Sequence, residues 1–118
     1  MVYFFDTYAL IELTKNNPNY LSYSDELVNT TLFNLVELYY SILRDFNEET
    51  AKKIYYRYKE CVSQVNDDIV FEASKLKLRN KKLSYIDCIG YIFALKNNLK
   101  FLTGDKEFKD IANVEFVK

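Results

Sequence analysis

The sequence predicts an α/β protein, a three-layer α/β/α sandwich with a short central parallel sheet. Short continuous apolar runs of strand length alternate with longer helical patterns along the chain. With only two glycines and one proline, long helices with few tight turns are expected. The 118 residues, 49% of them hydrophobic, suffice for one core, and we expect a single domain over residues 1–118.

The order of the elements follows from these patterns. Strand signals mark Val2 to Phe5, Glu26 to Thr30, Lys100 to Thr103, and Val114 to Val117. Helical signals mark Ala9 to Leu13, Thr31 to Phe46, Asn47 to Gln64, Asp67 to Lys82, Ser84 to Asn98, and Asp105 to Ile111. The first helix must stop by Pro18, because the residue before a proline disfavours helical geometry. The helix from Thr31 is apolar around most of its circumference, which is typical of a helix buried between other elements.

Histidine is absent, and its absence excludes several kinds of site. A Ser-His-Asp or Cys-His catalytic unit and an HExxH zinc site all need an imidazole. Two distant cysteines, Cys61 and Cys88, cannot complete a zinc site and are expected to be free thiols in a reducing cytoplasm. Neither a signal peptide nor a membrane span is recognisable, so we expect a soluble cytoplasmic protein. The chemistry that remains is that of carboxylates, hydroxyls, lysines and a metal they could hold.

Two carboxylates directly follow predicted strands. In a parallel sheet ligands gather at the carboxyl ends of the strands, where Asp6 and Asp105 stand. Taken singly, each is better explained as the N-cap of the helix that begins beside it. Two further acids lie on helices. Glu37 belongs to a narrow polar stripe, with Asn34, Ser41 and Arg44, that would face either water or a cleft. Asp87 fits a capping box with Ser84.

One shared site would explain all four acids together. Four converging carboxylates raise one another's pKa and need positive charge among them. Mg²⁺ or Mn²⁺ suits oxygen-only ligands, and such a cation supports phosphodiester hydrolysis without a histidine base.

The ordered motifs resemble those of PIN-domain ribonucleases, and most of all the VapC-type toxins of prokaryotic toxin-antitoxin pairs. The resemblance rests on segments 2–7, 34–40, 83–87 and 101–108 and spans nearly the whole chain. It implies a PIN-like fold and an endoribonuclease that uses Mg²⁺ or Mn²⁺ to cleave RNA and leaves a 5′-phosphate. It also implies a homodimer and a cognate antitoxin protein as partner.

Carried over to this sequence, the resemblance makes four residues the catalytic, metal-binding acids. They are Asp6, Glu37, Asp87 and Asp105. Thr103 matches a hydroxyl residue that supports the last acid, although an ordinary strand threonine explains it equally well. Glu107 stands where some members have a further ligand, and we expect it to be a solvated helix acid. Tyr8 departs from the family, whose members often have a small polar residue at this position.

Other functions stay open on the sequence alone. They are an RNA-processing PIN-like nuclease outside a toxin-antitoxin pair, a catalytically idle module that binds RNA or protein, a nuclease acting on DNA flaps, and a phosphoryl-accepting receiver domain. The formal charge of −1 shows no basic surplus for nucleic acid. When the four proposed ligands are set aside, however, 13 acidic residues remain against 16 basic ones, so the rest of the chain is mildly basic.

Overall fold

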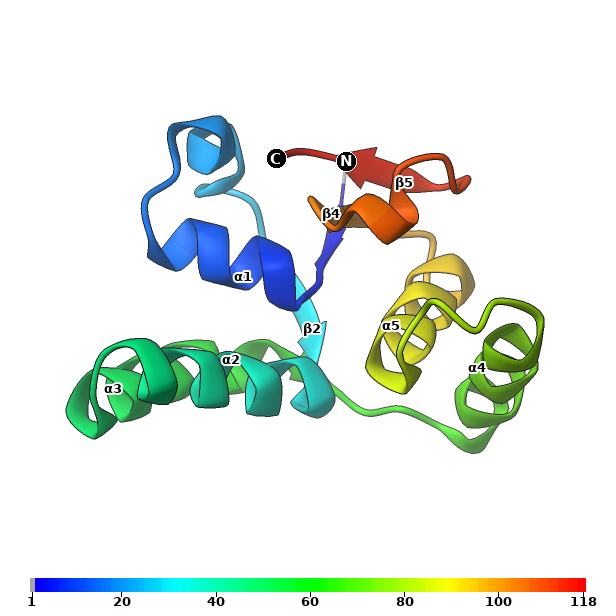
Figure 1. Ribbon diagram of the computed structural model, residues 1–118, viewed down its shortest axis with the longest axis horizontal. Coiled ribbons are helices and arrows are strands. Elements are labelled where there is room, and N and C mark those ends of the chain that lie inside the picture. Colours follow the sequence, from blue (N-terminus) through cyan, green and yellow to red (C-terminus); the bar gives the residue numbers. More distant parts are fainter. Residues whose placement is uncertain (1) are drawn as a thin grey trace.

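A five-stranded parallel sheet forms the centre of the computed structural model, which describes residues 2–118 (Figure 1). Its order is β3-β2-β1-β4-β5. The strands are β1 (Tyr3–Phe5), β2 (Val28–Thr31), β3 (Val62–Ser63), β4 (Lys100–Thr103) and β5 (Val114–Phe116). The helices are α1 (Thr7–Thr14), α2 (Leu32–Asp45), α3 (Glu48–Tyr58), α4 (Asp67–Arg79) and α5 (Tyr85–Lys96). Short 3₁₀ helices are η1 (Pro18–Tyr23), η2 (Lys59–Cys61) and η3 (Lys106–Phe108).

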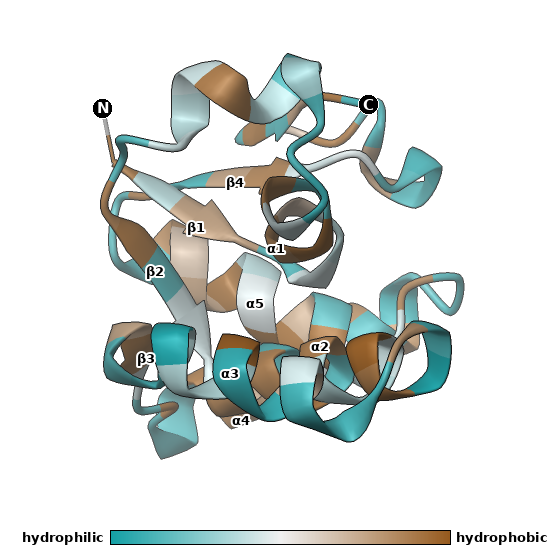
Figure 2. Cartoon of the chain, turned by 90° about the vertical axis from the view of Figure 1, so that its left-hand side faces the viewer, coloured by the Kyte–Doolittle hydropathy of each residue, from teal (hydrophilic) through white to brown (hydrophobic). Residues whose placement is uncertain are grey.

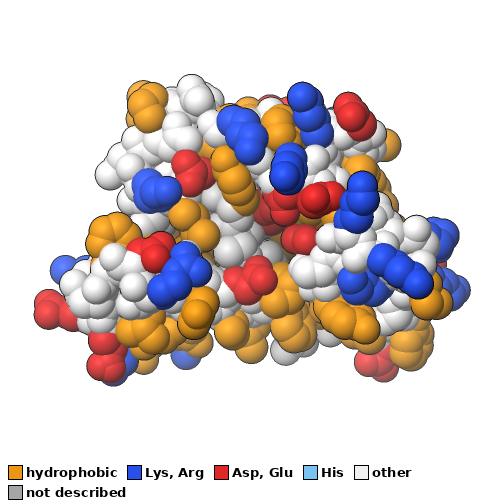
Figure 3. Space-filling model, viewed as in Figure 1, with side chains coloured by type: hydrophobic (Ala, Val, Ile, Leu, Met, Phe, Trp, Pro, Cys, Tyr) orange, Lys and Arg blue, Asp and Glu red, His pale blue; other side chains and the backbone are white. Residues whose placement is uncertain are grey.

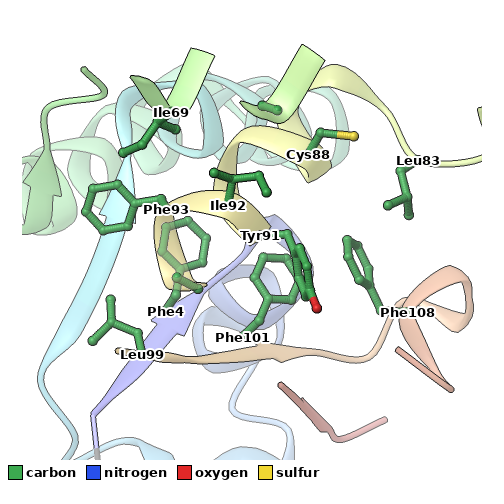
Figure 4. Packing of buried hydrophobic residues seen from close by; sticks show 12 residues of the cluster. Phe4, Ile69, Leu83, Cys88, Tyr91, Ile92, Phe93, Leu99, Phe101 and Phe108 are labelled. Atoms are coloured by element: carbon green, nitrogen blue, oxygen red, sulfur yellow. The ribbon is translucent and has the colours of Figure 1, made fainter. Parts of the chain in front are cut away.

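Side chains of the central strands alternate between two separate cores, one on each face of the sheet. Phe4 and Phe101 point to the face covered by α4 and α5, where their rings stack with centroids 5.5 Å apart (Figure 4). Phe5 and Leu102 point to the opposite face, covered by α1, α2 and α3. This alternation is the two-residue period of a strand buried on both faces. Figure 2 shows β1 and β4 as hydrophobic strands, with hydrophilic residues on α3. The predicted α/β/α sandwich is confirmed.

The prediction of one helix from Asn47 to Gln64 is wrong beyond Tyr58. Helix α3 ends at Tyr58, and Val62–Ser63 form strand β3 at the edge of the sheet. Two pairings with β2 hold this strand, Thr30 with Val62 and Thr31 with Ser63. Such a short strand has no periodicity of its own, and it exists only because β2 offers a free edge.

Smaller differences concern the ends of helices. The helix predicted up to Lys82 ends at Arg79, and the one predicted from Asp105 to Ile111 is only the 3₁₀ turn η3. Helix η1 was not predicted. It begins at Pro18, and its buried Tyr20 donates a hydrogen bond to the carbonyl of Val117 at 2.6 Å.

Each α-helix begins with a side-chain N-cap. The caps are Asp6, Thr31, Asn47, Asn66 and Ser84. Because α1 and α2 directly follow β1 and β2, their N-termini lie at the carboxyl edge of the sheet. Two polar caps are therefore built into this edge. Among residues 2–118, no helix has the length and apolar character that crossing a membrane requires.

Gly104 allows the C-terminal segment and α1 to approach the turn after β4. A Cβ atom at this position would collide with the ring of Tyr8 and with the backbone carbonyl oxygen of Val117. At Gly90, in contrast, the nearest atom is the ring of Phe4, 2.8 Å away, which is a side chain. The two glycines therefore differ in what must move when a methyl group is added.

We predict that Gly104→Ala lowers the free energy of unfolding by about 2 kcal/mol, because a backbone group must shift. Gly90→Ala is the matched control. There the crowding against Phe4 is offset by the roughly 1 kcal/mol gain of alanine over glycine inside a helix. Urea unfolding of both variants checks this, and an equal or smaller loss for Gly104→Ala would contradict it.

Candidate functional site

The four predicted acids lie at the carboxyl edge of the sheet. Asp6 follows β1 directly, and Asp105 follows the neighbouring strand β4 after Gly104. Glu37 lies on the second turn of α2, and Asp87 lies in the first turn of α5. Acidic side chains gather in a hollow at the centre of one face, with Lys and Arg side chains around it (Figure 3). The structure therefore brings together acids from four separate parts of the chain.

Asp6 is the most deeply buried of these carboxylates, with 4% of its surface exposed. Its Oδ1 accepts a hydrogen bond from the main-chain N–H of Ala9 at 2.9 Å. Burial is the largest cause of a raised pKa at Asp6, and the carboxylates of Asp87 and Asp105 add to the rise. Thr103 and the hydrogen bond from Ala9 lower it, and the resulting pKa is about 8. A carboxyl group in this place is ionised at neutral pH only when a cation is close.

The other carboxylates also influence one another. Burial raises the pKa of Glu37, with a further contribution from Asp87, while the hydrogen bond from Thr7 lowers it. Burial likewise raises the pKa of Asp87, with Asp105 and Glu107 adding to the rise and the bonds with Ser84 opposing it. No Lys or Arg among the described residues is a cause of these shifts. The site thus concentrates negative charge without a compensating side chain.

Capping and site formation involve the same residues. Asp87 and Ser84 form the predicted capping box, in which the N–H of Ser84 donates to Oδ2 of Asp87 at 3.0 Å. Oδ1 of Asp105 accepts from the N–H of Glu107 at 3.0 Å, and Oε1 of Glu37 accepts from the Thr7 hydroxyl. In these three acids the hydrogen bonds within residues 2–118 engage one carboxylate oxygen and leave the other available.

Thr103 lies between the two acids that follow the strands. It is fully buried, and its hydroxyl oxygen accepts from the N–H of Asp105 at 3.0 Å. Its side chain also lies close enough to Asp6 to lower the pKa of that carboxyl group. Thr103 therefore ties the positions of both acids to the end of β4. Glu107 is half-buried and near enough to raise the pKa of Asp87, so its surroundings are those of the acidic cluster rather than of an isolated surface acid.

The sequence did not identify Thr7, Asn34 and Thr31 as members of the site. Thr7 donates to Glu37, the Nδ2 group of Asn34 donates to Thr7 at 3.2 Å, and Thr31 donates to Asn34 at 2.7 Å. Asn34 was placed only on the polar stripe of its helix. The sequence does hold one signal for Asn34. Its amide side chain comes three residues after the threonine N-cap Thr31, in a helix whose other buried residues are apolar.

The donor set fits a hard divalent cation. All its members are carboxylates or hydroxyls, and no histidine competes. Within residues 2–118, no three acidic or thiol side chains stand close enough to surround one metal ion. Mg²⁺ needs no such set, because it is usually held through one or two carboxylates and keeps several waters. The oxygens left available at the hollow meet that smaller requirement.

Comparison with known proteins gives a family and a fold. The sequence model of the PIN domain matches residues 3–114. Mycobacterium tuberculosis VapC20, described as a sarcin-ricin loop cleaving toxin, has a similar structure, with a TM-score of 0.81, 18% identity and 98% of each chain covered. For VapBC-1 from nontypeable Haemophilus influenzae the TM-score is 0.73 at 22% identity, covering 98% of this chain and 96% of that one.

A third similar structure is VapBC2 from Rickettsia felis, with a TM-score of 0.75, 16% identity and both chains fully covered. A comparison with curated proteins finds no significant match. At such low identities the structures establish the fold, and the family rests on the sequence match. Since that match spans nearly all of the chain, the protein belongs to the PIN domain family.

Proposed function

We propose that this protein is a Mg²⁺- or Mn²⁺-dependent endoribonuclease and the toxin of a toxin-antitoxin pair. One observation carries the proposal: carboxylates from four parts of the chain meet in one hollow, and no Lys or Arg among residues 2–118 contributes to the raised pKa values of Asp6, Glu37 and Asp87. The similar structures support it, because the same fold belongs to a toxin described as cleaving the sarcin-ricin loop and to a toxin-antitoxin complex from Klebsiella pneumoniae. We further propose a cytoplasmic protein that acts as a homodimer and is bound by its antitoxin.

The proposed roles follow from the geometry. Asp6, Glu37, Asp87 and Asp105 would hold the metal either directly or through the water molecules bound to it. Thr103 would keep Asp6 and Asp105 in place at the end of β4. A bound divalent cation supplies an activated water and neutralises charge on the scissile phosphate. The carboxylates determine where the cation would bind. Backbone N–H groups donate hydrogen bonds to three of them and so hold their side chains in place.

The acidic hollow is compatible with an RNA substrate. Lys and Arg side chains surround it on the same face (Figure 3). Once the negative charge of the hollow is neutralised by a cation, the basic surround attracts a phosphate backbone. Water is the attacking group in this scheme and the 3′-oxygen is the leaving group. The 2′-hydroxyl of the RNA therefore takes no part, and the products carry a 5′-phosphate and a 3′-hydroxyl.

We predict that Asp87→Asn lowers the rate of RNA cleavage at least about 100-fold, the loss typical of removing one well-placed electrostatic contact. The asparagine oxygen can still accept from Ser84, so the fold is retained, as circular dichroism would show. Asp67→Asn is the matched control, because Asp67 is an exposed acid in the first turn of α4. If Asp87→Asn and Asp67→Asn cleave RNA equally fast, the acidic hollow is not the active site.

Removing metal ions tests the cofactor. We expect EDTA to abolish cleavage of a structured RNA by the purified protein, and added Mg²⁺ or Mn²⁺ to restore it. Undiminished cleavage in EDTA would exclude metal dependence. Binding of RNA without any cleavage under all metal conditions would instead favour a catalytically idle module.

The pH dependence of stability tests the state of Asp6. Its folded pKa of about 8 lies above the ordinary value of 3.8, so unfolding releases a proton between these pH values. The free energy of unfolding therefore falls as pH rises through this window, by up to about 1.4 kcal/mol per pH unit. Asp6→Asn keeps the N-cap but cannot titrate.

We predict that, in chelator, Asp6→Asn is more stable than the wild type at pH 8 and that the difference shrinks towards pH 4. Urea unfolding at several pH values measures the difference. A difference that does not change with pH would show that Asp6 has an ordinary pKa.

The toxin role is separable from the nuclease activity. Induced expression of the wild type should stop bacterial growth, whereas Asp87→Asn should not. A small antitoxin gene beside this one should relieve the arrest when co-expressed. Cleavage without growth arrest would point to an RNA-processing nuclease outside a toxin-antitoxin pair.

A further inference from the structure

A continuous line of polar side chains runs from the start of α2 to the acidic hollow. Thr31 donates to Oδ1 of Asn34, Nδ2 of Asn34 donates to Oγ1 of Thr7, and Thr7 donates to Oε1 of Glu37. The donor–acceptor distances are 2.7, 3.2 and 2.5 Å. Thr31 is fully buried and Asn34 is 2% exposed. Polar groups this deep are costly unless they are hydrogen-bonded, so this line is a built feature of the fold.

The direction of every bond in the line is fixed by its first member. The backbone N–H of Asn34 can only donate, and it donates to Oγ1 of Thr31 at 3.4 Å. The Thr31 hydroxyl proton is then free for Oδ1 of Asn34, which can only accept. This turns the NH₂ group of Asn34 towards Thr7. The Thr7 oxygen accepts that bond, and its own proton is left for Glu37.

Glu37 depends on the end of this line. It is half-buried, and among the described residues Thr7 is the one hydrogen-bond partner of its side chain. Oε1 is thereby held, and Oε2 is left for another ligand. Thr7 and Glu37 also line the same groove beside α2, so the held carboxylate borders open space. A Thr7 hydroxyl free to rotate would not hold Glu37 in one orientation.

We propose that Asn34, oriented by Thr31, is a positioning residue that acts through the Thr7 hydroxyl to hold Glu37 in its metal-binding orientation. Asn34 itself is buried behind Thr7. This inference rests on the proposed metal-dependent nuclease activity and deepens it. It assigns a function to a polar residue of α2 that lies one turn before the acid it serves.

The first variant is Asn34→Asp, which keeps the shape of the side chain and, when ionised, cannot donate to Thr7. The Thr7 proton is then drawn to position 34 and away from Glu37. Asn34→Leu is measured beside it, because a leucine side chain has no donor in any protonation state. We expect Mn²⁺ binding, followed by electron paramagnetic resonance without RNA, to weaken about tenfold, as for other groups that support metal ligands. The kcat for RNA cleavage should fall by a similar factor with KM unchanged. Ser74→Ala is the control, because Ser74 is an exposed hydroxyl residue of α4 outside this line and this groove, and it should change neither quantity.

Two further variants separate positioning from a merely structural role. Thr7→Val should reproduce the loss, and Thr7→Ser should restore Mn²⁺ binding to the wild-type level. The double variant Asn34→Asp with Thr7→Val should be no worse than Thr7→Val alone, because both act on one bond. If Asn34→Asp does not fold by circular dichroism, Asn34→Leu alone provides the test, since it also removes the donor without adding charge.

The outcomes distinguish this inference from the proposed function. If the wild type binds Mn²⁺ and cleaves RNA while a folded Asn34 variant does both equally well, the positioning role is wrong and the nuclease stands. Losses that multiply in the double variant also overturn it, because Asn34 would then act independently of Thr7. A wild type that neither binds Mn²⁺ nor cleaves RNA would overturn the proposed function and this inference together.

Discussion

Mutual repulsion among carboxylates at one edge of a parallel sheet is the constraint on which the site depends. Asp87 and Asp105 each raise the pKa of another acid in the hollow. Burial strengthens the effect, most of all at Asp6. A fold that kept these groups together only for stability would have balanced them with Lys or Arg. The arrangement instead fits the proposal that a divalent cation completes it, and backbone N–H donors stabilise the carboxylates without that cation.

The fold supplies those donors through its topology. Strands β1 and β4 are neighbours and both end at this edge, and each is followed by a turn whose N–H groups face an acid. Helix α5 presents its own N-terminus through the capping box of Ser84 and Asp87. The carboxylates are therefore held by backbone N–H groups, which a side-chain substitution does not remove. Gly104 in turn allows the turn after β4 to pack closely against Tyr8 and Val117. Stability and the proposed function compete at Asp6, because a neutral side chain in this buried place would make the protein more stable in the absence of a metal ion.

Most of the fold could be predicted from the sequence, because its signals are local. Apolar runs marked four strands, and caps such as Ser84 marked the starts of helices. Strand β3 could not be predicted, since two residues carry no period and only the free edge of β2 makes them a strand. The line from Asn34 through Thr7 was missed for a related reason. It joins residues 27 positions apart on different helices, and only the packing of α1 on α2 reveals it.

The ionisation of Asp6 is the most direct measure of the central claim that the hollow is incomplete without a cation. Nuclear magnetic resonance of ¹³C-labelled aspartate can follow its carboxyl carbon in a pH titration, with Asp6→Asn providing the assignment. We expect a pKa of about 8 in metal-free buffer and a value well below neutrality once Mg²⁺ is added. A pKa near the ordinary 3.8 without metal, unchanged by Mg²⁺, would contradict the account.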